Sequence, residues 1–130
     1  MNLEKQLIDS IRANKLALIE DYDSSEAVNS FYVNGESMWL DKNTRVGLVN
    51  STQIAKAAGS DFVVLWAKNK SFKIGCDTLL QMLSVLELYA MDCYNVTAEH
   101  KAKVKSLEDL NRLNNYDYTK GYPKRLSFSV

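Results

Sequence analysis

The sequence predicts an α+β fold: two β-hairpin–helix units form a small, mainly antiparallel sheet packed by helices, with an N-terminal helix and a C-terminal strand. The first observation is an order of elements that occurs twice, at residues 31–58 and again from residue 62. Each copy has two short apolar segments joined by a turn, then an acidic residue suited to a helix N-cap, then an amphipathic run. The second observation is composition. A chain of 130 residues with 46% hydrophobic and 25% charged residues is typical of a globular domain.

Residues 3–20 predict the first helix, because their apolar side chains fall mostly on one helical face. The polar segment 21–25 is rich in residues that favour turns, so it ends this element. We therefore separate an N-terminal helix or arm, residues 1–21, from a single α+β domain, residues 22–130. The apolar stripe is narrow, and it is consistent either with packing in the core or with a semi-detached arm.

The first hairpin is predicted around Asn34-Gly35, a dipeptide that suits a type I′ turn because both turn residues need positive φ. Asp41 follows as a helix N-cap, since its carboxylate can accept from backbone N–H groups of the first turn. Gly59 is placed to end this second helix at the C′ position.

The second hairpin combines the apolar run 62–67, a turn at 68–71 and the alternating segment 72–74. Thr78 and Gln81 then fit a capping box at the start of a long helix. The apolar residues of this helix recur every three or four positions: Leu79, Met82, Leu86, Tyr89, Cys93, Val96 and His100. Such a stripe belongs either to a core helix or to a self-associating seam.

At the C-terminal end, Ser106 and Asp109 indicate a new cap and a short helix through Leu113. The segment 126–130 alternates apolar residues with serines, which predicts a strand. We expect this strand to pair at a sheet edge, its own or a neighbour's, and to bury Phe128.

Aromatic residues are the main candidates for binding. Three tyrosines interleave with basic residues near the C-terminal end, and interfaces are enriched in aromatic residues and Arg. The candidate interface therefore comprises Tyr116, Tyr118, Tyr122, Lys124, Arg125 and Phe128. Trp39 and Trp66 hold corresponding places in the two hairpins, where we expect them to pack in the core. A stacking platform for single-stranded nucleic acid would use similar residues, but 16 basic residues balance 16 acidic ones, so no nucleic-acid partner is expected.

The chain carries no recognisable catalytic pattern. His100 is the one histidine, and no convergent set of Cys, His, Asp and Glu surrounds it in sequence, so we expect no metal or other cofactor and no catalytic residues. Glycine-rich phosphate loops and nucleophile elbows are also missing from the sequence. Cys76 and Cys93 lie among apolar residues and are expected to be reduced thiols. The sequence thus predicts a protein that is not an enzyme and that does not insert in a membrane.

Several segments together resemble an uncharacterised domain family of tailed bacteriophages and prophages of Bacteroides-type gut bacteria, encoded near tail-fibre and virion genes. The resemblance covers about residues 22–130, and the N-terminal helix lies outside it. The matching segments are Asp23–Gly35, Met38–Leu48, Leu65-Trp66, Cys76–Thr78, Gln81–Leu83, Leu86–Thr97 and Tyr116–Pro123.

This resemblance implies a structural or adaptor protein of the phage particle, a tail or head accessory that acts by protein–protein contact. The alternative is a tail-fibre assembly chaperone, and an alternative of another class is a small nucleic-acid-binding regulator or enzyme. The implied partners are other phage structural proteins, and the implied location is the virion, or the host cytoplasm during assembly. Because particle proteins work in symmetric sets, a homo-oligomer is also expected.

Overall fold

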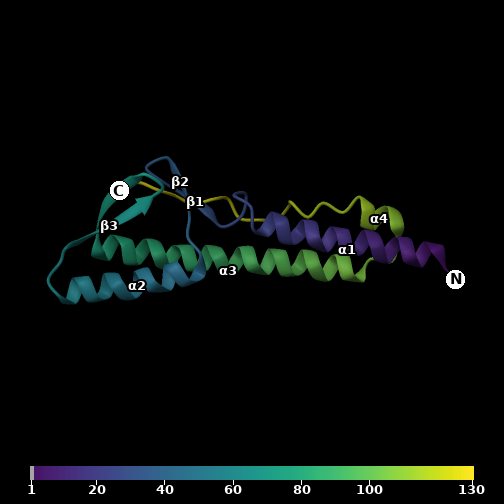
Figure 1. The fold of residues 1–130 in the computed structure, drawn as a ribbon, viewed down its shortest axis with the longest axis horizontal. Helices are drawn as coiled ribbons and strands as arrows, with labels where there is room; N and C mark the ends of the chain where they lie inside the picture. Colours follow the sequence, from purple (N-terminus) through teal and green to yellow (C-terminus); the bar gives the residue numbers. More distant parts are fainter. Residues whose placement is uncertain (1) are drawn as a thin grey trace. The chain divides into compact units, whose positions relative to one another are not determined.

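The computed structural model describes residues 2–130, which form helices, two hairpins, a short C-terminal strand and connecting segments (Figure 1). The helices are α1 (Leu3–Asp23), α2 (Lys42–Ala57), α3 (Cys76–Ser106) and α4 (Leu110–Asn114). The strands are β1 (Ser30–Val33), β2 (Glu36–Trp39), β3 (Phe62–Ala67), β4 (Lys70–Gly75) and β5 (Ser127–Phe128). The predicted α+β class, with its N-terminal helix and C-terminal strand, is confirmed.

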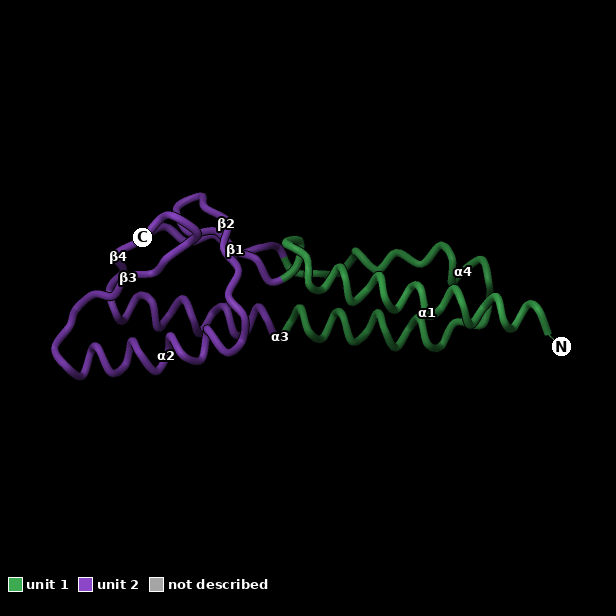
Figure 2. Tube along the Cα trace, in the orientation of Figure 1, with its two compact units in different colours: residues 1–28, 91–123 green, residues 29–90, 124–130 purple. Residues whose placement is uncertain are grey.

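The chain divides into two compact units, and each combines segments that are distant in sequence (Figure 2). Unit 1 contains residues 2–28 and 91–123, and unit 2 contains residues 29–90 and 124–130. Helix α3 begins in unit 2 and ends in unit 1. This division does not coincide with the boundary after residue 21 that the sequence suggests.

Unit 2 holds all five strands, in two sheets. The first has the order β2–β1–β5, with β2 antiparallel and β5 parallel to β1. The second is the antiparallel pair β3–β4. The hairpins therefore form two small sheets rather than the one sheet that the sequence predicts, although β2 and β3 contact each other. An ion pair of 2.5 Å between Glu36 of β2 and Lys70 of β4 also connects them.

One hydrophobic core lies beneath both sheets. It contains alternate residues of the hairpins, Leu40 and the first part of α3, and partly buried residues of α2 pack against it. The fully enclosed members include Phe31, Val33, Ile74, Leu79 and Leu83. In Figure 2 the strands of unit 2 lie above α2 and α3. Each sheet thus has one face on the core, and its other face is turned away from it.

The turn and cap signals of the first repeat form as predicted. Asn34 and Gly35 adopt φ values of 50° and 82°, as a type I′ turn requires. The Asp41 carboxylate accepts a 2.7 Å hydrogen bond from the Thr44 amide at the start of α2. Gly59, with φ of 95°, lies just past the end of α2, where the amide of Ser60 donates to the Ala55 carbonyl.

The start of α3 differs from the prediction. The helix begins at Cys76, directly after β4, so Thr78 lies inside the first turn rather than at an N-cap. The Cys76 amide donates to the Asp61 carbonyl at 2.9 Å and is satisfied by the neighbouring strand instead. The predicted capping box of Thr78 and Gln81 is therefore wrong, because β4 leads into the helix without a loop.

The C-terminal segment completes the first sheet, as predicted. Strand β5 pairs with the edge of β1, and the ring of Phe128 meets that of Phe31 edge-on, with 6.0 Å between centroids. The Asn34 side chain extends this pairing: its amide donates to the Val130 carbonyl, and its oxygen accepts from the Val130 amide. Phe128 is half-buried against the core.

In unit 1, α1 packs in a core, which decides between the two alternatives for this helix. Ile8 and Ile19 of α1 are buried with Val104 of α3 and Leu113 of α4. Asp109 caps α4 as predicted, since its carboxylate accepts from the Arg112 amide at 3.0 Å.

The apolar stripe of α3 is buried within its own chain. Its members Leu79, Met82, Leu86, Tyr89, Cys93 and His100 are all buried, and Val96 is half-buried. The core-helix alternative therefore holds, and the stripe is not available as a seam between copies. A homo-oligomer stays a prediction that needs another surface. Cys76 and Cys93 are both free, buried thiols.

Candidate protein-binding surface

Large apolar side chains alternate along the solvent side of β3. Phe62, Val64 and Trp66 expose 53%, 54% and 63% of their surface, whereas Leu65 and Ala67 face the core. On the neighbouring strand, Lys73 lies opposite Val64 and Ser71 lies opposite Trp66. Both faces of β3 are thus apolar, and only one of them is covered by the rest of the unit.

Trp39 adds a further exposed ring from the other hairpin. It lies at the end of β2 with 56% of its surface exposed, while its neighbour Met38 is buried in the core. The expectation that Trp39 and Trp66 pack in the core is therefore wrong. In both strands the inward positions belong to smaller or more flexible side chains, and the strand alternation turns each tryptophan outward.

We call Trp39, Phe62, Val64, Trp66 and Lys73 the outer face of unit 2. Because the alternate residues of both hairpins are buried in one core, these side chains all point away from that core. The contact between β2 and β3 makes the two halves neighbours. Several large exposed apolar side chains on one side of a unit are typical of an interaction site.

The charge on this face is positive. The Lys73 ammonium lies over the Phe62 ring, 4.5 Å from its centre, a cation–π arrangement. At the strand positions turned away from the core, the side chains are aromatic, Val, Ser, Gly or Lys, with no Asp or Glu. Unit 2 as a whole has eight basic and five acidic residues, a net charge of +3, whereas unit 1 has eight and eleven, a net charge of −3. The neutral total therefore conceals two oppositely charged units.

Arg125, one of the sequence-predicted interface residues, lies beside β1. The Arg125 guanidinium donates to the Ser30 hydroxyl at 3.1 Å and lies 4.9 Å from the centre of the Tyr32 ring. Lys124 is exposed. Together with Phe128, these residues belong to unit 2.

The three sequence-predicted tyrosines lie in unit 1, so the predicted interface set is divided between the units. Tyr116 and Tyr118 are half-buried against the unit 1 core. Tyr118 and Tyr122 both contact the ring of Tyr22 on α1, at centroid distances of 5.8 and 5.5 Å. Their role at an interface stays a prediction.

The hydroxyl groups of this tyrosine segment bond within the unit. Tyr122 contacts Thr97 at 2.6 Å, and Thr97 in turn donates to the Asp23 carboxylate at 2.7 Å. Since Asp23 only accepts, the Thr97 hydroxyl accepts the proton of Tyr122. The phenol groups thus anchor the segment after α4 to α1 and α3.

Two hydrogen bonds of His100 define which ring nitrogen carries the proton in the neutral imidazole. Nε2 lies 2.7 Å from the Lys120 carbonyl, which can only accept, so Nε2 carries the proton. Nδ1 then accepts from the Tyr116 hydroxyl at 2.6 Å. Burial raises the pKa of Tyr116, with a smaller contribution from the charge of Asp117, so this phenol is a poor nucleophile. The His100–Tyr116 pair fits a role in holding the segment in place.

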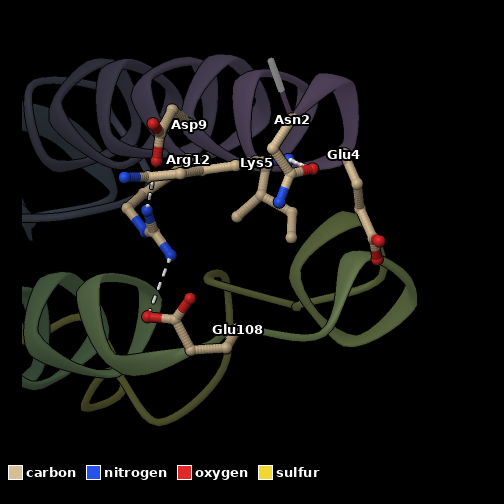
Figure 3. A pocket seen from close by; sticks show the side chains of 7 residues that line it. Asn2, Glu4, Lys5, Asp9, Arg12 and Glu108 are labelled. Carbon is tan, nitrogen blue, oxygen red and sulfur yellow. Dashed lines mark hydrogen bonds and ion pairs between the residues drawn. The ribbon is translucent and has the colours of Figure 1, made fainter.

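A pocket of about 400 Å³ opens beside the start of α1 (Figure 3). Its lining combines Asn2, Glu4, Lys5, Ile8, Asp9, Arg12 and Glu108. Arg12 is the central group: Nη2 donates to the Leu107 carbonyl at 2.7 Å, Nε to the Val104 carbonyl at 3.4 Å and Nη1 to Asp9 at 3.0 Å. The guanidinium therefore satisfies carbonyls where α3 ends. Nη2 also forms an ion pair with Glu108 at 3.6 Å, so all three nitrogens of the guanidinium are engaged and the group has little to offer a ligand.

Within residues 2–130, no three His, Cys, Asp or Glu side chains converge as metal ligands would. In the same described part of the chain, no helix is long and apolar enough to span a bilayer.

Comparisons of the chain with protein-family models, with characterised proteins and with solved structures find no match. The outer face of unit 2, on which both tryptophans are exposed, is the structural feature that bears most directly on binding.

Sequence reasoning missed the outer face, although the sequence contains a signal for it. The β3–β4 turn comprises two residues, Lys68 and Asn69, and this register sets Lys73 opposite Val64. A lysine in the middle of a strand marks the solvent side of the sheet. Val64, opposite Lys73, must then face solvent, and so must Phe62 and Trp66, which lie two positions away on the same strand.

Proposed function

We propose that this protein is a structural or adaptor component of a bacteriophage particle and that it acts by contact with other phage structural proteins. Two independent arguments support the proposal. The resemblance of residues 22–130 to a domain family of tailed phages suggests the biological setting. The outer face of unit 2 suggests the mode of action, and it is the observation that carries the proposal.

The composition of the outer face favours protein binding. Tryptophan is among the residues most often found to dominate binding energy at interfaces, and both tryptophans of the chain lie on this face. A partner that covers this apolar surface gains about 25 cal/mol of favourable free energy for each Å² that it removes from water. Exposing this much apolar surface without a partner would favour aggregation instead.

The proposed partners are other virion proteins, and the proposed location is the particle, or the host cytoplasm during assembly. We also propose that several copies act together, since particle proteins are arranged in symmetric sets. No catalytic step is part of the proposal. His100, the one histidine, is engaged with Tyr116 and Lys120.

Mass spectrometry of purified particles tests the proposal. Peptides of this protein at a stoichiometry comparable to known virion components are the expected result. Peptides in the infected-cell lysate but not in purified particles would contradict it, and would favour a tail-fibre assembly chaperone.

A phage encoding Trp66→Ser extends the test to the outer face. This exposed side chain can be replaced at little cost to folding, so the protein should accumulate normally while its copy number in particles falls. Ile54→Ser is the matched control, since Ile54 is 69% exposed on α2, away from the outer face. Equal incorporation of the two variants would exclude the outer face as the assembly contact.

A further inference from the structure

We propose that the outer face of unit 2 binds an extended protein segment that turns both large apolar and acidic side chains toward the face, at every second position. This inference rests on the proposed function, because it names the partner chemistry of the same surface. Three properties of the face carry it: its charge, its aliphatic centre and its area.

Charge selects an acidic partner. Lys73 is on the face itself, and Lys68 lies in the β3–β4 turn at its edge. The strand positions turned away from the core lack Asp and Glu, and the surrounding unit has a net charge of +3. A carboxylate placed beside Val64 would meet the Lys73 ammonium without an opposing acidic group. Basic segments would meet only like charge, which disfavours them.

The centre of the face favours protein over nucleic acid. Bases bind to such sheets by stacking on free aromatic faces. Here Val64, an aliphatic residue, lies between Phe62 and Trp66 on the strand, and one side of the Phe62 ring is already covered by Lys73. Aliphatic side chains such as Leu pack well in these positions, whereas a run of stacked bases would be interrupted.

The area favours a segment over a second copy of this chain. Side chains of this size expose roughly 400–500 Å² in total at the fractions seen for Trp39, Phe62, Val64 and Trp66. A stable dimer buries about 800 Å² on each partner. The face is therefore too small for a dimer interface of its own, and it suits a short extended segment in which every second side chain is turned toward the face.

Tryptophan fluorescence of the full chain provides a direct assay, because Trp39 and Trp66 are its two tryptophans and both lie on the face. The probe is a short synthetic peptide with Ser at every second position and, at the positions between, Leu or Phe taking turns with Asp or Glu, so that apolar and acidic side chains lie on one side of the extended chain. One control peptide has Lys at the acidic positions, and a second has Ser at the apolar positions. We expect a saturable blue shift with the first peptide and binding weaker by at least about tenfold with each control.

Two variants test the residues that are held responsible. Lys73→Glu should reverse the charge preference, so that the lysine peptide binds more tightly than the acidic one. Val64→Ser should weaken binding of the acidic peptide by about tenfold, as expected for one lost apolar anchor. Lys42→Glu and Ile54→Ser are the matched controls on α2, and both should leave binding unchanged. Far-UV circular dichroism and the melting temperature verify that each variant is folded.

Several results would overturn the inference. These are equal binding of the acidic and lysine peptides, no binding of the acidic peptide, tighter binding of oligo(dT) than of the peptide, or a Trp66-dependent dimer in sedimentation.

The two proposals can fail separately. If the Trp66→Ser phage loses the protein from its particles and the acidic peptide does not bind, the assembly role stands and the partner chemistry is wrong. If the peptide binds as expected and the variant assembles normally, the binding chemistry stands and the assembly role fails.

Discussion

Arg12 and His100 show how single polar side chains connect segments that are distant in sequence. Each reaches across its unit to backbone carbonyls: Arg12 to those at the end of α3, and His100 to that of Lys120. The Val104 carbonyl also accepts from the Leu107 amide at 3.4 Å, so the contact of Arg12 with the Leu107 carbonyl matters more. A partly buried carbonyl left without a partner costs about 1–3 kcal/mol. The periodicity of apolar residues in the sequence predicts neither contact, because each contact joins segments that only the folded chain brings together.

Arg12→Ala should therefore lower the free energy of unfolding by about 1.5–3 kcal/mol, the range for hydrogen bonds made by a charged group. Its side chain is 18% exposed, so little screening by solvent is expected. Urea unfolding followed by circular dichroism measures the change. Arg112→Ala is the control, because Arg112 is exposed on α4, and it should change stability by less than about 0.5 kcal/mol. Equal losses in the two variants would contradict the capping role.

Asp41 should contribute to acid sensitivity. Hydrogen bonds from the amide and side chain of Thr44 hold the pKa of Asp41 below its usual value of 3.8. A carboxyl group whose pKa is lower in the folded than in the unfolded state stabilises above the unfolded pKa, and this contribution is lost as the pH falls. Asp41→Asn keeps an N-cap acceptor but does not titrate.

We therefore expect Asp41→Asn to change stability little at neutral pH and to make the fall of unfolding free energy between about pH 5 and 2 shallower. Urea titrations at a series of pH values measure that slope. An unchanged slope, or a large loss of stability at neutral pH, would show that the carboxylate acts in some other way.

At the scale of elements, local chemistry predicts much of the fold. The Asn34-Gly35 turn, the Asp41 and Asp109 caps and the end of α2 at Gly59 all depend on a few adjacent residues, and all are confirmed. The solvent side of β3 was harder to assign because both of its faces are apolar. Which face of β3 meets solvent follows only from how β3 pairs with β4, and that pairing is not visible in β3 alone. The division of α3 between two units likewise leaves no mark in its continuous stripe.

The β3–β4 turn offers a second test at this scale. Lys68 has φ of 56°, in the left-handed region that side chains with a Cβ adopt at a cost, whereas Asn69 does not. Lys68→Gly should raise the free energy of unfolding by up to about 1 kcal/mol, since relief of this strain exceeds the added flexibility of the unfolded chain. Thermal unfolding measures it. Asn69→Gly relieves no such strain and should not stabilise, so a matching gain there would contradict the explanation.

Strand β5 depends on one aromatic contact. Phe128→Ala removes the ring that packs edge-on against Phe31 and should cost about 2 kcal/mol, less than the 3–5 kcal/mol of a fully buried Phe because this side chain is only half-buried. A lowered melting temperature is the expected observation. Lys124→Ala, at an exposed position of the same segment, should leave it unchanged. If deletion of residues 125–130 alters neither stability nor assembly, β5 contributes nothing essential.

At the scale of the whole molecule, the two units differ in composition more than the total suggests. The net charge of zero led to the expectation of no nucleic-acid partner, yet unit 2 is basic and unit 1 is acidic. Composition averages over residues that the fold later separates, so it cannot reveal this difference. The candidate interface was affected in the same way: its tyrosines and its C-terminal residues are adjacent in sequence but belong to different units.

The pairing of β5 with β1 also has a consequence for biosynthesis. Asn34 and Val130, whose side chain and backbone close this pairing, are 96 residues apart. During translation β1 and β2 emerge early, but the edge of β1 has to wait until residues 124–130 have left the ribosome exit tunnel. Nascent domains form as their segments become available, and pairing of distant segments is slow. Throughout that interval β1 presents unpaired backbone groups beside the Phe31 ring that Phe128 later contacts, and a neighbouring nascent chain could occupy them.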